Sequence, residues 1–177
     1  MIAVRGRWLF ACVVVLALLA SANSLANGFA YDDVALIVTS ARVHGWAGWW
    51  TEFARTYWPE GDGYRPLTML AWRAQWTLGG GSPLPFHAVS VALHVAASAA
   101  VLWLSLQMLP IGAAVVAAAL YAVHPVHVEA IANVAGQSEL FVALAAVLAT
   151  AIYLRARSAG AVSWRAWLAI APLYAAA

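Results

Sequence analysis

Charge and cysteine are both scarce in this chain of 177 residues. Charged residues make up 9% of the sequence and hydrophobic residues 65%, and the mean hydropathy is +0.82. This balance excludes an ordinary water-soluble domain and is typical of an integral membrane protein. A single cysteine, Cys12, excludes an intrachain disulfide. All nine basic residues are Arg and none is Lys, which we attribute to coding bias in a chain so rich in Ala.

Long apolar runs predict an all-α, polytopic membrane fold with about five transmembrane helices and a long first outer loop that carries interfacial helices. The predicted spans cover residues 8–26, 86–108, 111–123, 138–154 and 164–177. At ~1.5 Å per residue the first is about 28 Å long, close to the thickness of a hydrocarbon core. The chain stops inside an apolar run, so we expect residues 1–177 to be the N-terminal part of a longer membrane protein.

The first apolar run has two interpretations. In the first, the run is a signal peptide, with Ser24-Leu25-Ala26 as a small-residue cleavage site. We prefer a retained anchor, because the remainder of the chain is also apolar. Either interpretation leaves Asp32 and Asp33 on the non-cytoplasmic side.

The distribution of Arg predicts the orientation in the membrane. With a cytoplasmic N-terminus, the outer loops are residues 27–85 and 124–137, and the second of these has no Arg or Lys. The cytoplasmic segments then hold five cations, which are Arg5, Arg7, Arg155, Arg157 and Arg165. This asymmetry follows the positive-inside rule. We expect a bacterial inner membrane, with the outer face periplasmic or, in other cells, lumenal.

The first outer loop is rich in aromatic residues. Leu67 to Leu78 is predicted to form a short helix, and before it six aromatic residues recur at helical spacing, namely Trp46, Trp49, Trp50, Phe53, Tyr57 and Trp58. They predict either an amphipathic helix in the membrane interface or a hydrophobic core within the loop itself. The sequence favours neither.

Adjacent carboxylates at a membrane boundary indicate a functional site, because buried charge there is costly. A carboxylate placed there can act as a general base toward a hydroxyl, and an Arg can hold a phosphate through paired hydrogen bonds. Alternatively, both acids cap the following segment. Glu139, one residue into a predicted span that Ser138 is expected to cap, also requires a partner.

Histidines gather near the same face. His124 and His127 precede Glu129, with Pro125 suited to the first turn of a helix. His87 and His94 share one helical face but lie about 10 Å apart along the axis, too far to bind one ion together. We therefore predict no metal site; a divalent ion is not indicated.

Four short motifs occur at loop ends, in the order Tyr31-Asp32-Asp33, Tyr64-Arg65-Pro66-Leu67-Thr68, Phe86-His87 through Leu93-His94, and the run from His124 to Leu140. In this order they resemble the N-terminal membrane region of the transmembrane and TPR-containing protein family. These proteins are GT-C type glycosyltransferases related to protein O-mannosyltransferases. The resemblance covers nearly the whole chain from Phe29 onward.

The resemblance implies a GT-C-like fold and transfer of a sugar, mannose in the eukaryotic members, from a polyprenyl-phosphate donor to a protein hydroxyl on the outer face. It implies Asp32 or Asp33 as the base and Arg65 as the ligand of the lipid phosphate. Further substrate-binding residues are expected at Tyr31, His87, His94, His124, His127, Glu129, Gln137 and Glu139. The implied partners are membrane lipid, donor and protein acceptor, with no nucleic acid and no certain cofactor. The fragment alone is expected to be inactive.

Two departures from the family pattern weaken the donor site. The chain has Gln137 where the family usually has Arg, and Ser90 where it usually has Asn. The alternative function is a non-catalytic polytopic scaffold or a transporter fragment. A transport path needs polar groups near mid-membrane, whereas residues 95–123 are almost entirely apolar.

Overall fold

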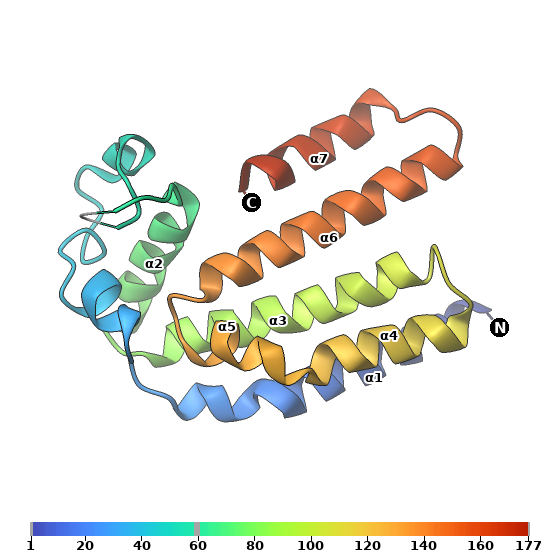
Figure 1. The fold of residues 1–177 in the computed structure, drawn as a ribbon, viewed down its shortest axis with the longest axis horizontal. Coiled ribbons are helices and arrows are strands. Elements are labelled where there is room, and N and C mark those ends of the chain that lie inside the picture. Colours follow the sequence, from blue (N-terminus) through green and yellow to red (C-terminus); the bar gives the residue numbers. More distant parts are fainter. Residues whose placement is uncertain (1, 59–60, 177) are drawn as a thin grey trace.

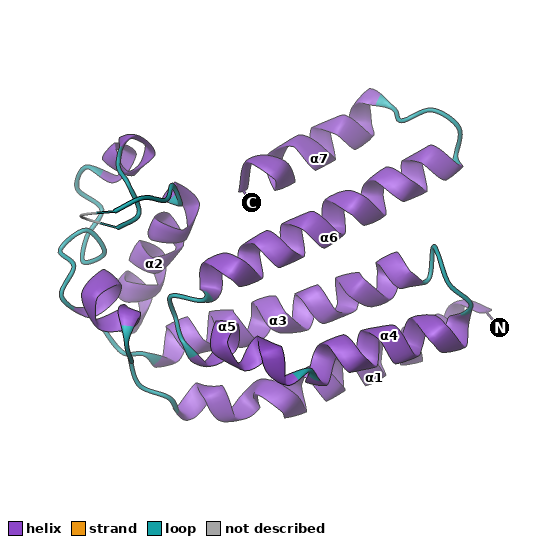
Figure 2. Cartoon of the chain, in the orientation of Figure 1, coloured by secondary structure: helices purple, strands orange, loops and turns teal. Residues whose placement is uncertain are grey.

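Helices and connecting loops make up the computed structural model of the protein, which describes residues 2–58 and 61–176, and no strand occurs within these ranges (Figures 1 and 2). The long helices are α1 (Ile2–Ser21), α3 (Leu84–Ser105), α4 (Ile111–Val123), α6 (Gln137–Ser158) and α7 (Trp164–Ala176). They lie side by side as a bundle, in which α3 contacts α1, α4 and α6, and α7 packs on α6. The predicted all-α fold class of a polytopic helical membrane protein is confirmed.

Among the described residues, three helical segments are each long and apolar enough to cross a membrane: Gly6–Ala26, Leu84–Ser105 and Gln137–Ser158. A fourth crossing is formed if α4 and the helical turns after it, η4 (Pro125–His127) and α5 (Val128–Ala132), count as one bent span. The bend of 41° has a clear cause, since His124 is extended ahead of Pro125, whose ring disfavours a helical residue before it.

The predicted spans correspond to helices along most of their length. The fifth predicted span contains α7, which has 13 residues and is short for a crossing by itself. Residue 177 of that span, and residues 59 and 60 of the predicted first outer loop, lie outside the described residues.

Small residues let the helices approach closely inside the bundle. Ala114 and Ala118 lie one turn apart on α4 and are fully buried against Val13 of α1 and Leu102 of α3. Lipid tails are as apolar as these side chains, so the helices associate through close packing rather than through a hydrophobic driving force.

The predicted first outer loop, called the outer loop below, folds over one end of the bundle (Figure 1). It contains η2 (Val34–Val38), η3 (Trp49–Ala54) and α2 (Pro66–Gly79), the last of which confirms the helix predicted at Leu67 to Leu78. Its hydrophobic core joins Ile37, Val43 and Trp72 to side chains of the bundle end, Phe86 and Val134.

The six aromatic residues divide between the two predicted alternatives. Trp46, Trp49, Trp50 and Phe53 are between 43% and 62% exposed, whereas Tyr57 is only 3% exposed and packs in the core of the loop. A single amphipathic helix through all six is wrong, because the only helical part of this stretch within the described residues is η3.

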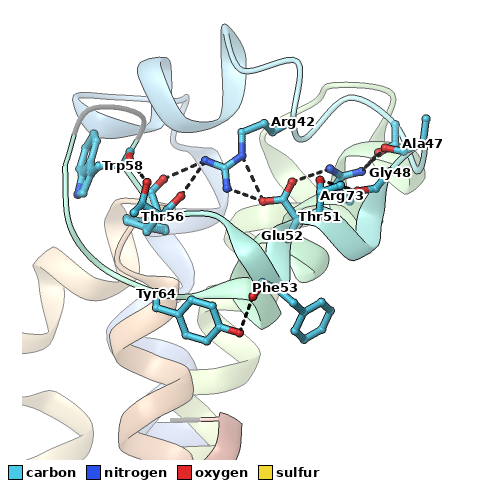
Figure 3. A network of polar contacts seen from close by, with 12 residues as sticks. Arg42, Ala47, Gly48, Thr51, Glu52, Phe53, Thr56, Trp58, Tyr64 and Arg73 are labelled. Carbon is cyan, nitrogen blue, oxygen red and sulfur yellow. Dashed lines mark hydrogen bonds and ion pairs between the residues drawn. The ribbon is translucent and has the colours of Figure 1, made fainter.

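A buried ion-pair network holds the loop in shape (Figure 3). Glu52 is 1% exposed and accepts hydrogen bonds from Arg42 and from Arg73, whose Nη2 lies 2.8 Å from Oε1. Arg42 also donates to the carbonyls of Thr56 and Tyr57. Burial alone raises the pKa of Glu52, but the two guanidinium groups outweigh it, so the pKa lies below its ordinary value.

We predict that Glu52→Gln lowers the stability of the outer loop by about 3 kcal/mol, because it leaves buried guanidinium groups without their counter-charge. The midpoint of thermal unfolding measures this. Since the folded pKa of Glu52 lies below 4.5, its contribution is complete above that pH and is lost as the pH falls through the folded pKa, so the variant should lack this acid-dependent part. Asp62→Asn, at an exposed position, is the matched control and should leave the midpoint unchanged.

Candidate functional site

A polar cavity of about 160 Å³ lies where the outer loop meets the link between α5 and α6. Four of the eleven predicted site residues line it: Asp32, Arg65, Glu129 and Glu139. The remaining lining residues are Tyr57, Trp58, Asn133, Ala135 and Gly136.

Asp32 and Asp33 have different surroundings. Asp33 is fully buried, and its carboxylate accepts hydrogen bonds from the backbone N–H groups of Ala30 (3.1 Å), Val134 (3.2 Å) and Ala135 (2.7 Å). Asp32 is exposed at the cavity, and no described Arg or His lies within 4.0 Å of its carboxylate. Asp33 therefore joins two parts of the chain, while Asp32 is free to meet a ligand.

The backbone at Tyr31 turns the chain toward the cavity. Its φ of 51° lies in the left-handed region, which is costly for a residue with a large side chain, by about 1–3 kcal/mol. The Tyr31 ring is 89% exposed and is not part of the cavity wall. Hydrogen bonds from Asp33 N to Ala30 O (3.0 Å) and from Val34 N to Tyr31 O (3.2 Å) stabilise the turn.

Arg65 is held at the cavity by two uncharged groups. Its Nη1 donates to Ser138 Oγ over 2.6 Å, and its guanidinium carbon lies 4.8 Å from the centre of the Tyr57 ring. Within the described residues its other N–H groups have no hydrogen-bond acceptor. The guanidinium is therefore fixed in place and still has most of its donors available for an anion.

Ser138 does not cap α6, contrary to the sequence prediction. The helix begins at Gln137 after Gly136, and Ser138 Oγ donates to the carbonyl of Ala135 while it accepts from Arg65. Gly136 has no room for a side chain, because a Cβ there would lie 2.6 Å from Cα of Ala130. This close approach brings the start of α6 against α5 and places Ser138 beneath the loop.

Gln137 lies in the packing between helices and not at the cavity. It is fully buried, exchanges two hydrogen bonds with the side chain of Gln75 (2.9 and 3.1 Å), and donates to the carbonyl of Phe86 (2.7 Å). Its amide has no donor left for a ligand.

The four predicted histidines also lie outside the cavity wall. His87 Nε2 contacts the carbonyl of Gly28 (3.3 Å), and His94 Nε2 that of Ala122 (3.0 Å). His124 Nδ1 accepts from the N–H of Val126, and the His127 ring lies 5.4 Å from that of His94. In the ranges that the structure describes, no three His, Cys, Asp or Glu side chains are grouped so as to hold a metal ion.

Sequence reasoning missed Tyr57, Asn133 and Ser138 as parts of the site. Asn133 lines the cavity with its Oδ1 fixed by the N–H of Ala135 at 2.8 Å, and its position between apolar neighbours was the available signal. Tyr57 was assigned only to the aromatic set. Burial raises the pKa of Tyr57 to about 12, against the opposing effect of Arg65.

Fold and site together define a multi-pass helical membrane protein with a polar cavity at one end of its helical bundle. The chain is 37% identical over 156 residues to protein O-mannosyl-transferase Tmtc2 of Drosophila melanogaster, which is 83% of this chain and 16% of that protein. It is 36% identical to protein O-mannosyl-transferase TMTC1 of Mus musculus over 81% of this chain and 17% of that protein. TMTC3 of Homo sapiens is 32% identical over 76% of this chain and 16% of that protein.

The chain belongs to this family of transmembrane and TPR-containing proteins, which confirms the resemblance drawn from the motifs. It spans about one sixth of the length of these curated relatives. No family model matches the chain, and no solved structure matches it.

We predict that Asp33→Asn destabilises the outer loop by about 3 kcal/mol, because an amide NH₂ would face backbone donors that now share a carboxylate. Asp32→Asn should change stability by less than ~0.5 kcal/mol, since its carboxylate has no partner among the described residues. Thermal unfolding of the two variants side by side measures the difference. Equal midpoints would contradict the structural role of Asp33.

Proposed function

We propose that the protein is part of a membrane glycosyltransferase that transfers a sugar, with mannose the first candidate, from a polyprenyl-phosphate donor to a protein hydroxyl. The observation that carries this proposal is the pairing, in one cavity, of the unpartnered carboxylate of Asp32 with the fixed guanidinium of Arg65. The names of the relatives, protein O-mannosyl-transferases, support the reaction class.

In this mechanism Asp32 is the general base. It takes the proton of the acceptor hydroxyl while the hydroxyl oxygen bonds to the anomeric carbon of the sugar. The bond between that carbon and the phosphate oxygen breaks, and its electron pair leaves with the phosphate. A direct displacement of this kind inverts the configuration at the anomeric carbon.

Arg65 binds the phosphate and stabilises the charge that develops on the leaving oxygen. The Ser138 hydroxyl and the Tyr57 ring hold the guanidinium without neutralising it. A preorganised cation of this kind needs little rearrangement during the reaction.

Glu129 and Glu139 complete the cavity. They come from α5 and from the first turn of α6, and both are exposed. Carboxylates are strong acceptors for O–H groups, so we assign them to the hydroxyls of the sugar. Tyr31, His87, His94, His124, His127 and Gln137 do not line the cavity, and under this proposal they shape its surroundings.

The cavity is proposed to face the outer side of a bacterial inner membrane. The N-terminus and the link between α6 and α7 lie at the opposite end of the bundle (Figure 1). Arg5 and Arg7 lie near the start of α1, and Arg155 and Arg157 lie in the last turn of α6, as the positive-inside rule expects of a cytoplasmic end.

We predict that Asp32→Asn in the intact protein lowers kcat for transfer from a radiolabelled polyprenyl-phosphate mannose by about 10²- to 10⁴-fold, with little change in KM for the donor. The amide has nearly the same shape but does not accept the proton. Asp62→Asn is the matched control and should keep full activity. Transfer at the wild-type rate by the Asp32 variant would contradict the proposal and favour a scaffold or transporter.

Arg65→Gln should raise KM for the donor by about tenfold or more, because it removes the charge that binds the phosphate. Arg55→Gln, an exposed Arg of the same loop outside the cavity, is the control. The donor concentration dependence of transfer measures both. An unchanged donor KM in Arg65→Gln would exclude Arg65 as the phosphate ligand.

A further inference from the structure

The hydroxyl of Tyr57 is a buried polar group that has no hydrogen-bond partner among the described residues. The residue is 3% exposed. An unpaired buried hydroxyl costs free energy, and a native structure that keeps one calls for an explanation.

Tyr57 is held too firmly to turn toward another partner. Its N–H donates to the carbonyl of Gly63 over 2.8 Å, and its carbonyl accepts from Nη1 of Arg42 over 3.2 Å. The ring packs against Trp58 and Trp72, with centroid separations of 5.7 and 5.8 Å. The loop core thus fixes both the backbone and the ring.

The ring of Tyr57 lies directly under the guanidinium of Arg65, and both residues line the cavity. Because burial raises the pKa of Tyr57 to about 12, the hydroxyl keeps its proton at neutral pH and can donate it to an acceptor. Two neighbouring side chains therefore offer unused donors at one place. A group with several anionic oxygens would satisfy both.

Electrostatics favours a second donor at this position. Among the described residues Arg65 is the only cation in the cavity wall, which also contains the carboxylates of Asp32, Glu129 and Glu139. These three repel an anion, so a phosphate bound by Arg65 alone would be opposed by three like charges. A neutral O–H donor adds attraction without a further charge to desolvate.

We propose that the Tyr57 hydroxyl binds the donor phosphate together with Arg65, so that the two residues form one site for an isoprenyl phosphate ester. This inference rests on the proposed function, because it assigns a second ligand to the same phosphate. Tyr57 thereby has two tasks: its ring holds the guanidinium, and its hydroxyl contacts the phosphate.

The test compares Tyr57→Phe with Tyr64→Phe in the intact protein in lipid nanodiscs. The substitution at Tyr57 keeps an aromatic ring under Arg65 and removes only the hydroxyl. Tyr64 lies in the same loop, but its hydroxyl already donates to the carbonyl of Phe53 over 3.1 Å (Figure 3). Tyr64 is not part of the cavity wall. The probe is farnesyl phosphate, with farnesol as the ligand that lacks the phosphate.

We expect Tyr57→Phe to bind farnesyl phosphate about tenfold more weakly than the wild type and farnesol equally well. Its unfolding midpoint without ligand should be unchanged or higher, because the lost hydroxyl had no partner. Tyr64→Phe should bind both ligands normally and unfold at a slightly lower temperature. Weaker binding without a loss of stability in Tyr57→Phe, and lower stability with normal binding in Tyr64→Phe, would distinguish a ligand contact from a structural role.

Wild-type affinity of Tyr57→Phe for farnesyl phosphate, with weakened binding by Arg65→Gln, would overturn this inference alone. Failure of the wild type to bind farnesyl phosphate better than farnesol would contradict the phosphate site of the proposed function as well. A lower unfolding midpoint of Tyr57→Phe with equal loss of both ligands would show a purely structural hydroxyl and would also overturn the inference.

Discussion

The carboxylate of Asp33 is the contact on which the arrangement of the candidate site depends. It joins Ala30, at the start of the outer loop, to Val134 and Ala135, about one hundred positions later in the chain. A buried carboxylate is stable only when its charge is compensated, and here three backbone N–H groups do so. The Asn27 side chain also joins these two parts of the chain, by donating to the carbonyl of Ala132. These contacts hold the start of the loop against the link between α5 and α6, which forms part of the cavity wall.

Polar groups around the bundle end differ in how completely they are paired. Some are saturated by other protein groups: Glu52 has two guanidinium partners, and Gln137 exchanges hydrogen bonds with Gln75 and the backbone. Those at the cavity are incompletely paired, as Asp32, Arg65 and Tyr57 show. Because folding normally satisfies polar groups that it buries, the unused donors and acceptors of these three residues favour a ligand at the cavity.

The fold could be predicted from the sequence because the bilayer imposes a simple rule. An apolar segment of this kind forms a helix because the helix pairs its own backbone N–H and C=O groups in hydrogen bonds. Composition and the length of the apolar runs were therefore enough to predict the fold class and the helices α3 and α6. The loop was harder, because Trp49 and Tyr57 have the same spacing pattern but opposite exposure. The difference in exposure depends on the tertiary contact of Tyr57 with Trp72, which the spacing of residues along the chain does not reveal.

The site could be predicted from the sequence only in part. Asp32, Arg65, Glu129 and Glu139 come together, but the sequence did not separate Asp32 from Asp33, since the distinction depends on N–H groups far along the chain. Gln137 was placed by motif position, whereas its direction at the start of α6 is set by packing against Gln75. The roles of these residues in catalysis stay predictions.

Residue 136 shows how little freedom such a junction has. A methyl group there would collide with the backbone of Ala130, which has no flexible end that can move aside. Either α6 or α5 would have to shift. A shift of α6 would move the Ser138 hydroxyl that accepts from Arg65, and it would also move the Gln137 amide that is packed between the helices. A position in the cavity wall with no side chain of its own thus couples the cation of the cavity to the packing of the bundle.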